Sequence, residues 1–119
     1  MRDEVVYLRH IRDAIAKISA YTEGGKKEFF SNPMIQDAVV RNLEIIGEAA
    51  GNLSPDFRKS HGKVPWRRIM GMRNVLAHEY FGVDLGIVWK VVTKRLPLLH
   101  RQIELMIKKN MGRGREGKK

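Results

Sequence analysis

The sequence predicts an all-α domain, an up-and-down bundle of four long helices and one short helix. Apolar residues recur every three or four positions through almost the whole chain, which is the spacing of one helix face. Cap residues, prolines and glycines divide this pattern into segments of helical length. No stretch of four or more residues alternates as a strand does between turn residues. The length of 119 residues fits one domain with one core.

Glycines separate the first two long helices. The first helix carries one apolar face, formed by Leu8, Ile11, Ile15 and Ile18. Residues 22–27, TEGGKK, then predict a loop, because two adjacent glycines disfavour a helix. Asn32 can cap the second helix, with Pro33 at its first position. That helix is predicted to continue to about Gly51.

The middle of the chain predicts a short helix followed by a long one. Ser54 and Pro55 repeat the cap-and-proline signal and open the short helix. The long helix is predicted from about Pro65 to about Tyr80, with Gly82 just past its end as a stop signal.

The last helix is predicted to begin at Asp84, which can cap it. Its apolar stripe consists of Leu85, Val88, Val92, Leu96, Leu99, Ile103 and Met106. Pro97 lies inside this stripe, where proline removes a backbone donor and clashes with the preceding turn. Because the stripe resumes in register after Pro97, we expect a kink there rather than the end of the helix.

The formal net charge is +10, and half of it comes from residues 108–119, which hold six basic residues and one acid. We predict a helical domain over residues 1–110 and a basic, disordered tail over residues 111–119. A basic surface attracts polyanions such as RNA, although the tail could serve only as a solvated solubility element. The candidate RNA-binding cations are Arg67, Arg68, Lys108, Lys109, Arg113 and Arg115. Arg67 and Arg68 could instead simply face solvent.

Composition and motif searches exclude several classes of protein. The chain has no cysteine, which excludes a disulfide scaffold and a thiolate zinc site. It has neither a run of ~18 apolar residues nor a secretory signal, so we expect a cytoplasmic protein that does not associate with membranes. Its four histidines lack the spacing of a helical metal site, and GxGxxG and P-loop motifs are absent. We therefore expect neither a metal nor a cofactor.

Residues 73–80, RNVLAHEY, bring together four chemically capable side chains. On a helix, Asn74 and His78 lie one turn apart on one face, and Arg73 and Tyr80 share an adjacent face. Histidine transfers protons near neutral pH, arginine holds a phosphate, and asparagine can orient either of them. These groups can cleave RNA without a metal, through attack of the ribose 2′-hydroxyl on the adjacent phosphorus. A surface helix with a histidine near its C-terminus is the alternative that the residues alone leave open.

The same segment supplies only one histidine per chain. Transesterification benefits from a base on one side of the phosphorus and an acid on the other. A symmetric dimer would bring a second copy of the segment across a two-fold axis. We therefore predict a homodimer with a composite site of two histidines and two arginines.

The spacing of Arg73, His78 and Tyr80 matches the R-x4-H-x-Y signature of HEPN-domain proteins. More narrowly, the chain resembles the HepT-like toxins of HepT–MntA toxin–antitoxin pairs over about residues 1–110. The likeness extends to residues 41–49, RNLEIIGEA. Pro65-Trp66, leading to residues 71–74, resembles the entry to the family's motif helix. Residues 84–109, with Leu96-Pro97 inside them, resemble its final helix.

This resemblance implies a dimeric HEPN-like bundle and a metal-independent endoribonuclease toxin. It implies that Arg73 and His78 form the catalytic pair and that Asn74 positions them or the phosphate. It also implies an MntA-like nucleotidyltransferase antitoxin, which can adenylylate Tyr80. Added AMP would place bulk and negative charge beside the catalytic pair. The alternative for Tyr80 is an amphipathic residue that packs its ring at the helix end.

Two other functions stay open at this point. The chain could be a non-catalytic helical dimer that docks a nucleotidyltransferase and binds nucleotide or RNA through the same edge, or a purely structural bundle. Trp66 and Trp89 could stack on bases, but we expect both in the core. Glu48 is expected to be a buried or interface acid, paired with an arginine.

Overall fold

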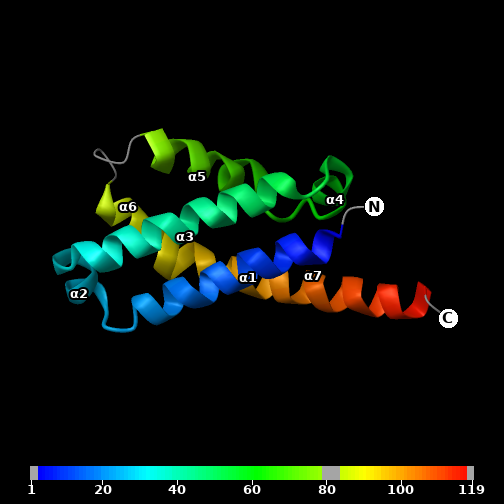
Figure 1. Cartoon of the computed structure of the whole chain (residues 1–119), viewed down its shortest axis with the longest axis horizontal. Helices are drawn as coiled ribbons and strands as arrows, with labels where there is room; N and C mark the ends of the chain where they lie inside the picture. Colours follow the sequence, from blue (N-terminus) through cyan, green and yellow to red (C-terminus); the bar gives the residue numbers. More distant parts are fainter. Residues whose placement is uncertain (1–2, 79–83, 118–119) are drawn as a thin grey trace.

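Helices make up nearly all of the chain that this computed structural model describes, which is residues 3–78 and 84–117, with side chains for 3–72 and 84–110. The elements are α1 (Glu4–Tyr21), α2 (Lys26–Ser31), α3 (Pro33–Asn52), α4 (Pro55–Ser60), α5 (Trp66–His78), α6 (Leu85–Lys90), the π-helical turn η2 (Val91–Arg95) and α7 (Leu96–Gly117). No strand occurs in these ranges, which confirms the all-α class. The long elements α1, α3, α5 and α6–η2–α7 alternate in direction, and α4 is the expected short helix (Figure 1).

Polar side chains cap the helices at the positions that the sequence predicts. Asn32 Oδ1 accepts hydrogen bonds from the N–H groups of Met34, at 3.0 Å, and Ile35, at 3.3 Å. Ser54 and Asp84 cap α4 and α6 in the same way. Each cap satisfies N–H groups that have no partner inside the helix, which fixes where the helix begins.

Helix α2 is an element that the sequence analysis did not predict. Gly25 adopts a positive φ of 91°, a conformation that glycine tolerates, and α2 begins at the next residue. Phe29 is fully buried and anchors the helix. Six residues make less than two turns, so they are too few to display an apolar period. Burial of one aromatic ring therefore stabilises a helix that spacing alone cannot reveal.

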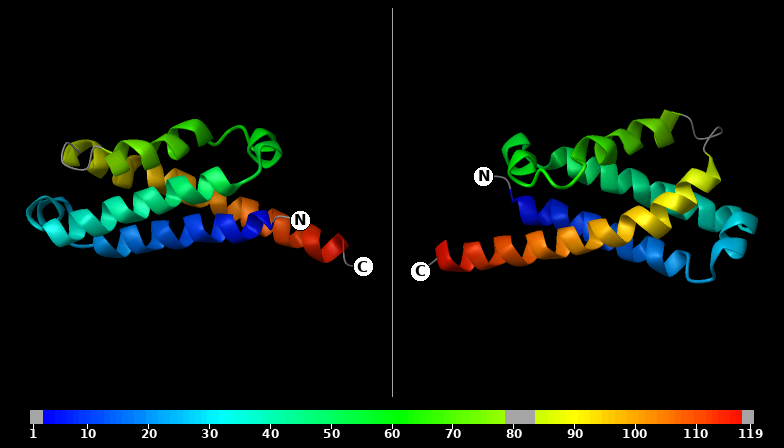
Figure 2. Two further views of the ribbon diagram at one scale, coloured as in Figure 1. Left: turned by 45° about the horizontal axis from the view of Figure 1, so that its top comes forward. Right: turned by 180° about the vertical axis from the view of Figure 1, so that it is seen from behind.

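The core lies where α3 packs between α1 and α5, and where α7 packs on α1 (Figures 1 and 2). The largest fully buried side chains are Leu8, Ile11, Ile18, Phe29, Val39, Leu43, Ile46, Leu53 and Ile103. They include three of the four residues predicted for the first helix face, and Ile15 is only 5% exposed. Burial of each such side chain contributes about 1.5–3 kcal/mol. No helix in the described ranges is long and apolar enough to span a bilayer.

The irregularity expected at Pro97 takes the form of the π-helical turn η2, directly before it. The N–H of Leu96 bonds to the carbonyl of Val91, five residues earlier. In an α-helix the ring of Pro97 would clash with the carbonyl of Thr93, four residues earlier. Proline also has no backbone N–H group that could donate a hydrogen bond to that carbonyl. The wider turn avoids this clash, and the chain changes direction there (Figure 2). The apolar stripe continues across it, because Val92 and Leu96 are both buried.

Two predicted boundaries fall near the limits of the described residues. Helix α5 is described as far as His78, so its predicted end at Tyr80 and the stop signal at Gly82 lie outside the described residues. Helix α7 continues to Gly117 and thus includes most of the segment expected to be a disordered tail. The division of the chain at residue 110 stays a prediction.

Candidate functional site

Helix α5, which carries the 73–80 segment, is anchored at its N-terminal end. Trp66 is only 7% exposed, as expected for a core residue, and its Nε1 donates a hydrogen bond to the carbonyl of His61 at 3.0 Å. The imidazole of His61 stacks on the ring of Phe57, with 4.3 Å between the ring centroids. Ile69 is buried one turn further along. These contacts hold the beginning of α5 on the segment that follows α4, and α5 packs on α3.

The backbone of Arg73, Asn74 and His78 is helical, as the sequence predicts. Asn74 and His78 are therefore one turn apart on the same face at the C-terminal end of α5. The side chains of these three residues, and all of Tyr80, lie outside the described residues. Their roles as catalytic and modification sites stay predictions.

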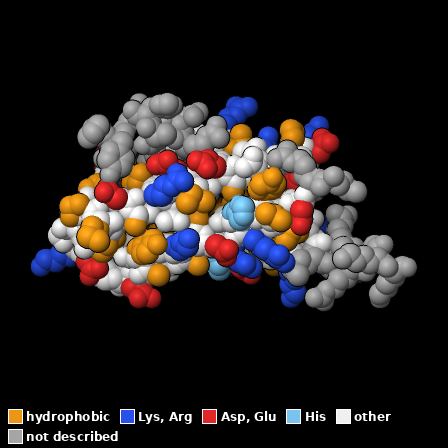
Figure 3. Space-filling model, in the orientation of Figure 1, with side chains coloured by type: hydrophobic (Ala, Val, Ile, Leu, Met, Phe, Trp, Pro, Cys, Tyr) orange, Lys and Arg blue, Asp and Glu red, His pale blue; other side chains and the backbone are white. Residues whose placement is uncertain are grey.

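The candidate RNA-binding cations lie at two separate places. Arg67 and Arg68 are exposed on α5, and Lys108 and Lys109 are exposed near the end of α7. The helical backbone of α7 also includes residues 113 and 115, but the side chains of Arg113 and Arg115 lie outside the described residues. On the face seen in Figure 3, basic and acidic side chains are interspersed, so the positive charge is not gathered there.

A groove of about 250 Å³, here called the α5–α7 groove, runs beside α5. Its lining includes Arg68, Ile69 and Met72 on one side and Val91, Arg95 and Leu98 on the other. Met72 directly precedes Arg73, so the groove reaches the beginning of the 73–80 segment. Leu98 lies at the edge of this groove and is 54% exposed. The sequence does not predict this groove, because its residues come from helical segments that only the fold brings together.

Acidic side chains on α3 pair with one arginine. Arg41 Nη1 lies 3.6 Å from Glu44 Oε2 and 3.8 Å from Glu48 Oε1. The expected pairing of Glu48 with an arginine is confirmed. The Glu48 side chain is 47% exposed, so it is not buried within the chain, and its place at an interface stays a prediction. A pair this open to solvent contributes at most about 1 kcal/mol to stability.

Trp89 is only half-buried, so the expectation that it belongs to the core is only partly correct. One side of its ring packs on Phe29, with 5.2 Å between ring centroids, and the residue also lines a second, larger groove between α1 and α7. Neither the composition nor the residue spacing predicts that part of the Trp89 ring is exposed beside a groove.

Comparison with known sequences identifies similar proteins across most of the chain. Residues 11–106 match the sequence model of the family described as “Ribonuclease HepT-like”. “Probable ribonuclease HepT” of Thermococcus cleftensis is 42% identical over 103 residues, which are 86% of this chain and 94% of that protein. “Putative RNase TTE0752” of Caldanaerobacter subterraneus subsp. tengcongensis is 42% identical over 104 residues, 87% of this chain and 93% of that protein.

A third relative is longer than this chain. “Gamma-glutamylcyclotransferase and putative RNase MJ0434” of Methanocaldococcus jannaschii is 44% identical over 103 residues. These residues are 86% of this chain but 46% of that protein, so the chain spans about half the length of this relative. The search of solved structures gave no match.

Proposed function

The chain belongs to the HepT-like ribonuclease family, and from this premise we propose that it is a metal-independent endoribonuclease toxin. The observation that carries the proposal is the position of Arg73 and His78 in the last turns of α5, inside the region that matches the family. Buried Trp66 and Ile69 hold this helix on the bundle. A rigid helix suits a catalytic pair, because catalysis requires the reacting groups to be held in a fixed geometry.

The reaction needs a base, an acid and a cation around one phosphorus. One His78 imidazole removes the proton of the ribose 2′-hydroxyl, and the resulting oxygen attacks the adjacent phosphorus. The bond from phosphorus to the 5′-oxygen of the next nucleotide breaks, and that oxygen takes a proton from a second imidazole. The Arg73 guanidinium stabilises the charge on the phosphoryl oxygens, while Asn74 positions the phosphate or the catalytic pair. The products are a 2′,3′-cyclic phosphate and a 5′-hydroxyl.

We place the second imidazole on a second copy of the chain, in a homodimer. The α5–α7 groove supports this arrangement, because it is largely apolar, has exposed Leu98 at its edge and adjoins the segment that begins at Arg73. A two-fold axis beside this groove would put the C-terminal ends of two α5 helices near each other. Each dimer would then hold two histidines and two arginines in one cleft.

A nucleotidyltransferase antitoxin of the MntA type is the proposed partner, and Tyr80 is the proposed site of its modification. Tyr80 follows His78 by two residues and Arg73 by seven, so an AMP group attached to its hydroxyl would lie close to both. The added phosphate is negatively charged and would repel the RNA backbone, while its adenosine would fill the cleft. Modification of one tyrosine would thereby neutralise the toxin.

The proposed function is tested by incubating the purified protein with RNA in excess chelator and analysing the ends of the fragments. We expect 2′,3′-cyclic phosphate and 5′-hydroxyl ends from the wild type, and a loss of at least about 100-fold in rate for His78→Ala and for Arg73→Ala. His10→Ala is the matched control, because His10 is an exposed histidine of α1, and its rate should not change.

Two outcomes would contradict this function. If both His78→Ala and Arg73→Ala retain cleavage, with folding confirmed by circular dichroism, the catalytic site does not lie on α5. Binding of RNA without cleavage at any protein concentration would favour a non-catalytic binding module instead.

A further inference from the structure

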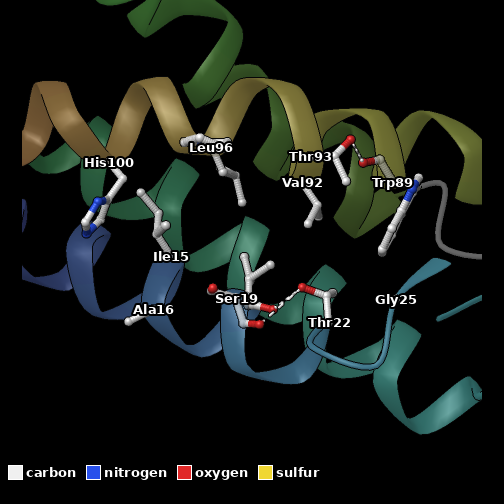
Figure 4. A pocket seen from close by; sticks show the side chains of 12 residues that line it. Ile15, Ala16, Ser19, Thr22, Gly25, Trp89, Val92, Thr93, Leu96 and His100 are labelled. Carbon is white, nitrogen blue, oxygen red and sulfur yellow. Dashed lines mark hydrogen bonds between the residues drawn. The ribbon is translucent and has the colours of Figure 1, made fainter. Parts of the chain in front are cut away.

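A second groove lies on the other side of α7 from the α5–α7 groove. This α1–α7 groove has a volume of about 650 Å³ and runs between α1 and the α6–η2–α7 segment (Figure 4). Its lining includes Ile15 and Thr22 on the α1 side. On the α6–η2–α7 side it includes Trp89, Thr93, Leu96 and His100. The volume is in the range of grooves that hold small organic ligands. None of the residues used in the proposed cleavage reaction lines it.

An aromatic ring and an apolar floor make this groove suitable for a flat, hydrophobic ring. Ile15 and Leu96 are buried side chains at its base. The ring of Trp89 extends from α6 towards Gly25 and Thr22 (Figure 4). Phe29 supports Trp89 from behind, with 5.2 Å between the ring centroids and 32° between the ring planes. A supported indole ring beside an open groove is a platform on which a nucleobase can stack.

Of the three residues with side-chain hydroxyls that line the groove, Thr22 and Thr93 offer a ligand hydrogen-bond acceptors. Thr22 donates its hydroxyl hydrogen to the carbonyl of Ile18 at 2.8 Å, and Thr93 donates to the carbonyl of Trp89 at 3.0 Å. Since each hydroxyl has one hydrogen, both oxygens can only accept a further bond. His100 adds an imidazole at one end of the groove. A ligand that donates hydrogen bonds through ring-edge N–H groups, as the amino group of adenine does, matches this set.

Exposed cations adjoin several of the residues that line the groove, but none of the described lining residues is a lysine or an arginine. A charged phosphate therefore has no partner within the groove. Five of the lining residues are each followed in sequence by an exposed cation: Lys17, Lys26, Lys90, Lys94 and Arg101. Only Thr22 is followed by an acid, Glu23. Consecutive residues on a helix point about 100° apart, so each of these cations, here called the rim cations, points to one side of the lining residue that it follows.

On these observations we propose that the α1–α7 groove binds one nucleotide unit, with its base against Trp89 and its phosphate at the rim cations. The apolar, acceptor-lined interior fits the base, and the basic rim fits the phosphate. Lys90, Lys94 and Arg101 have no ion-pair partner among the described residues, so they can engage a phosphate without breaking an existing ion pair. The source of the nucleotide is an RNA strand, and this last step rests on the proposed function. The groove then binds a nucleotide of the RNA substrate other than the two that flank the cleaved bond.

The test is a two-dimensional 1H–15N NMR titration that follows the indole N–H signals of the two tryptophans. Trp89 reports on the groove, and buried Trp66 is the internal control, since the chain has only these two. The probes are AMP, ribose 5-phosphate and a 2′-O-methyl oligo(A), which cannot be cut by attack of a 2′-hydroxyl. We expect AMP and the oligonucleotide to shift the Trp89 signal saturably and to leave the Trp66 signal in place. Ribose 5-phosphate, which lacks the base, should shift neither.

Two variants separate the base from the phosphate. Trp89→Leu should weaken binding of the oligonucleotide by about fivefold or more, because it removes the stacking platform. Lys94→Glu should weaken it and lower the slope of log K against log salt by about 0.7, the value for neutralising one phosphate of a single strand. Lys63→Glu is the matched control, because Lys63 is an exposed lysine that, unlike Lys94, is not next in sequence to a residue that lines the groove. Its binding should change much less than that of Lys94→Glu.

The proposal fails if no nucleotide shifts the Trp89 signal, or if ribose 5-phosphate shifts it as strongly as AMP. Saturable binding of AMP with no stronger binding of the oligonucleotide would identify a free nucleotide as the ligand and would overturn the RNA strand as its source. Cleavage of RNA is scored separately from this titration. A protein that cuts RNA but leaves Trp89 unaffected contradicts only the groove, whereas one that binds AMP without cutting RNA contradicts only the proposed function.

Discussion

At the scale of single residues, burial decides which side chains hold this fold together. Phe29 and Phe30 are neighbours on α2, with ring centroids 5.3 Å apart, yet Phe29 is fully buried and Phe30 is 40% exposed. Phe29 packs against Trp89 and so connects α2 to α6, whereas Phe30 faces partly into solvent. Two adjacent phenylalanines are therefore expected to contribute differently to the stability of the fold.

We expect Phe29→Ala to lower the free energy of unfolding by about 3–5 kcal/mol, because it leaves a cavity in the core. Phe30→Ala is the matched control and should cost less than half as much. Chemical denaturation of both variants, followed by circular dichroism, measures the difference. Equal losses for the two variants would show that α2 does not depend on the burial of Phe29.

The sequence predicts contacts between residues that are a few positions apart, but not contacts between residues far apart in the chain. The cap at Asn32 involves residues two and three positions away, so local spacing predicted it. Glu4 instead accepts a hydrogen bond from the backbone N–H of Ser54 at 3.0 Å, across 50 positions. Arg58 donates to the carbonyl of Leu53 at 2.7 Å and so closes the end of α3. Such a choice of partner depends on side-chain packing that spacing does not show.

At the scale of elements, the long periodic helices and the short capped helix α4 were predicted, whereas α2 and the π-helical turn η2 were not. Helices α1 and α3 each show several turns of apolar spacing, and α3 begins at its predicted cap. Helix α2 is too short to show a period. The π-helical turn η2 replaces a simple kink, since a proline predicts a disturbance but not its form.

The C-terminal end of α7 offers a prediction about RNA binding. Deletion of residues 110–119 removes Arg113, Arg115, Lys118 and Lys119 and keeps Lys108 and Lys109. We expect weaker binding of a 2′-O-methyl oligonucleotide and a lower slope of log K against log salt, by up to about 0.7 for each phosphate that these cations neutralise. The helical signal in circular dichroism should otherwise persist, because Ile107 is the last buried residue among the α7 side chains that the structure describes, which end at residue 110. An unchanged slope of log K against log salt would show that residues 110–119 do not contact the RNA phosphates.

At the scale of the whole molecule, the proposed site needs two copies of the chain. The 73–80 segment was predictable because its residues are close in sequence. The α5–α7 groove beside it was not, because Met72 and Leu98 meet only in the folded chain. A single copy supplies one His78, so association through this groove is the step that would complete the site.

Replacement of Leu98 by aspartate tests this mode of association. A charge placed in an apolar interface is costly unless it finds a partner, so we expect Leu98→Asp to raise the dimer dissociation constant by about tenfold or more. Met34→Asp is the matched control, because Met34 is 81% exposed and does not line the groove. Sedimentation velocity compares the two. A dimer equally weakened by both variants, or by neither, would place the interface elsewhere.

Subunit mixing tests the composite site most directly. Wild-type protein and His78→Ala protein are mixed at constant total concentration, allowed to exchange subunits, and assayed for RNA cleavage in excess chelator. If each cleavage event needs both imidazoles, only wild-type dimers are active, and an equal mixture retains about a quarter of the wild-type rate. A rate that falls in direct proportion to the wild-type fraction, to about half in the equal mixture, would mean that each subunit cuts RNA with its own histidine.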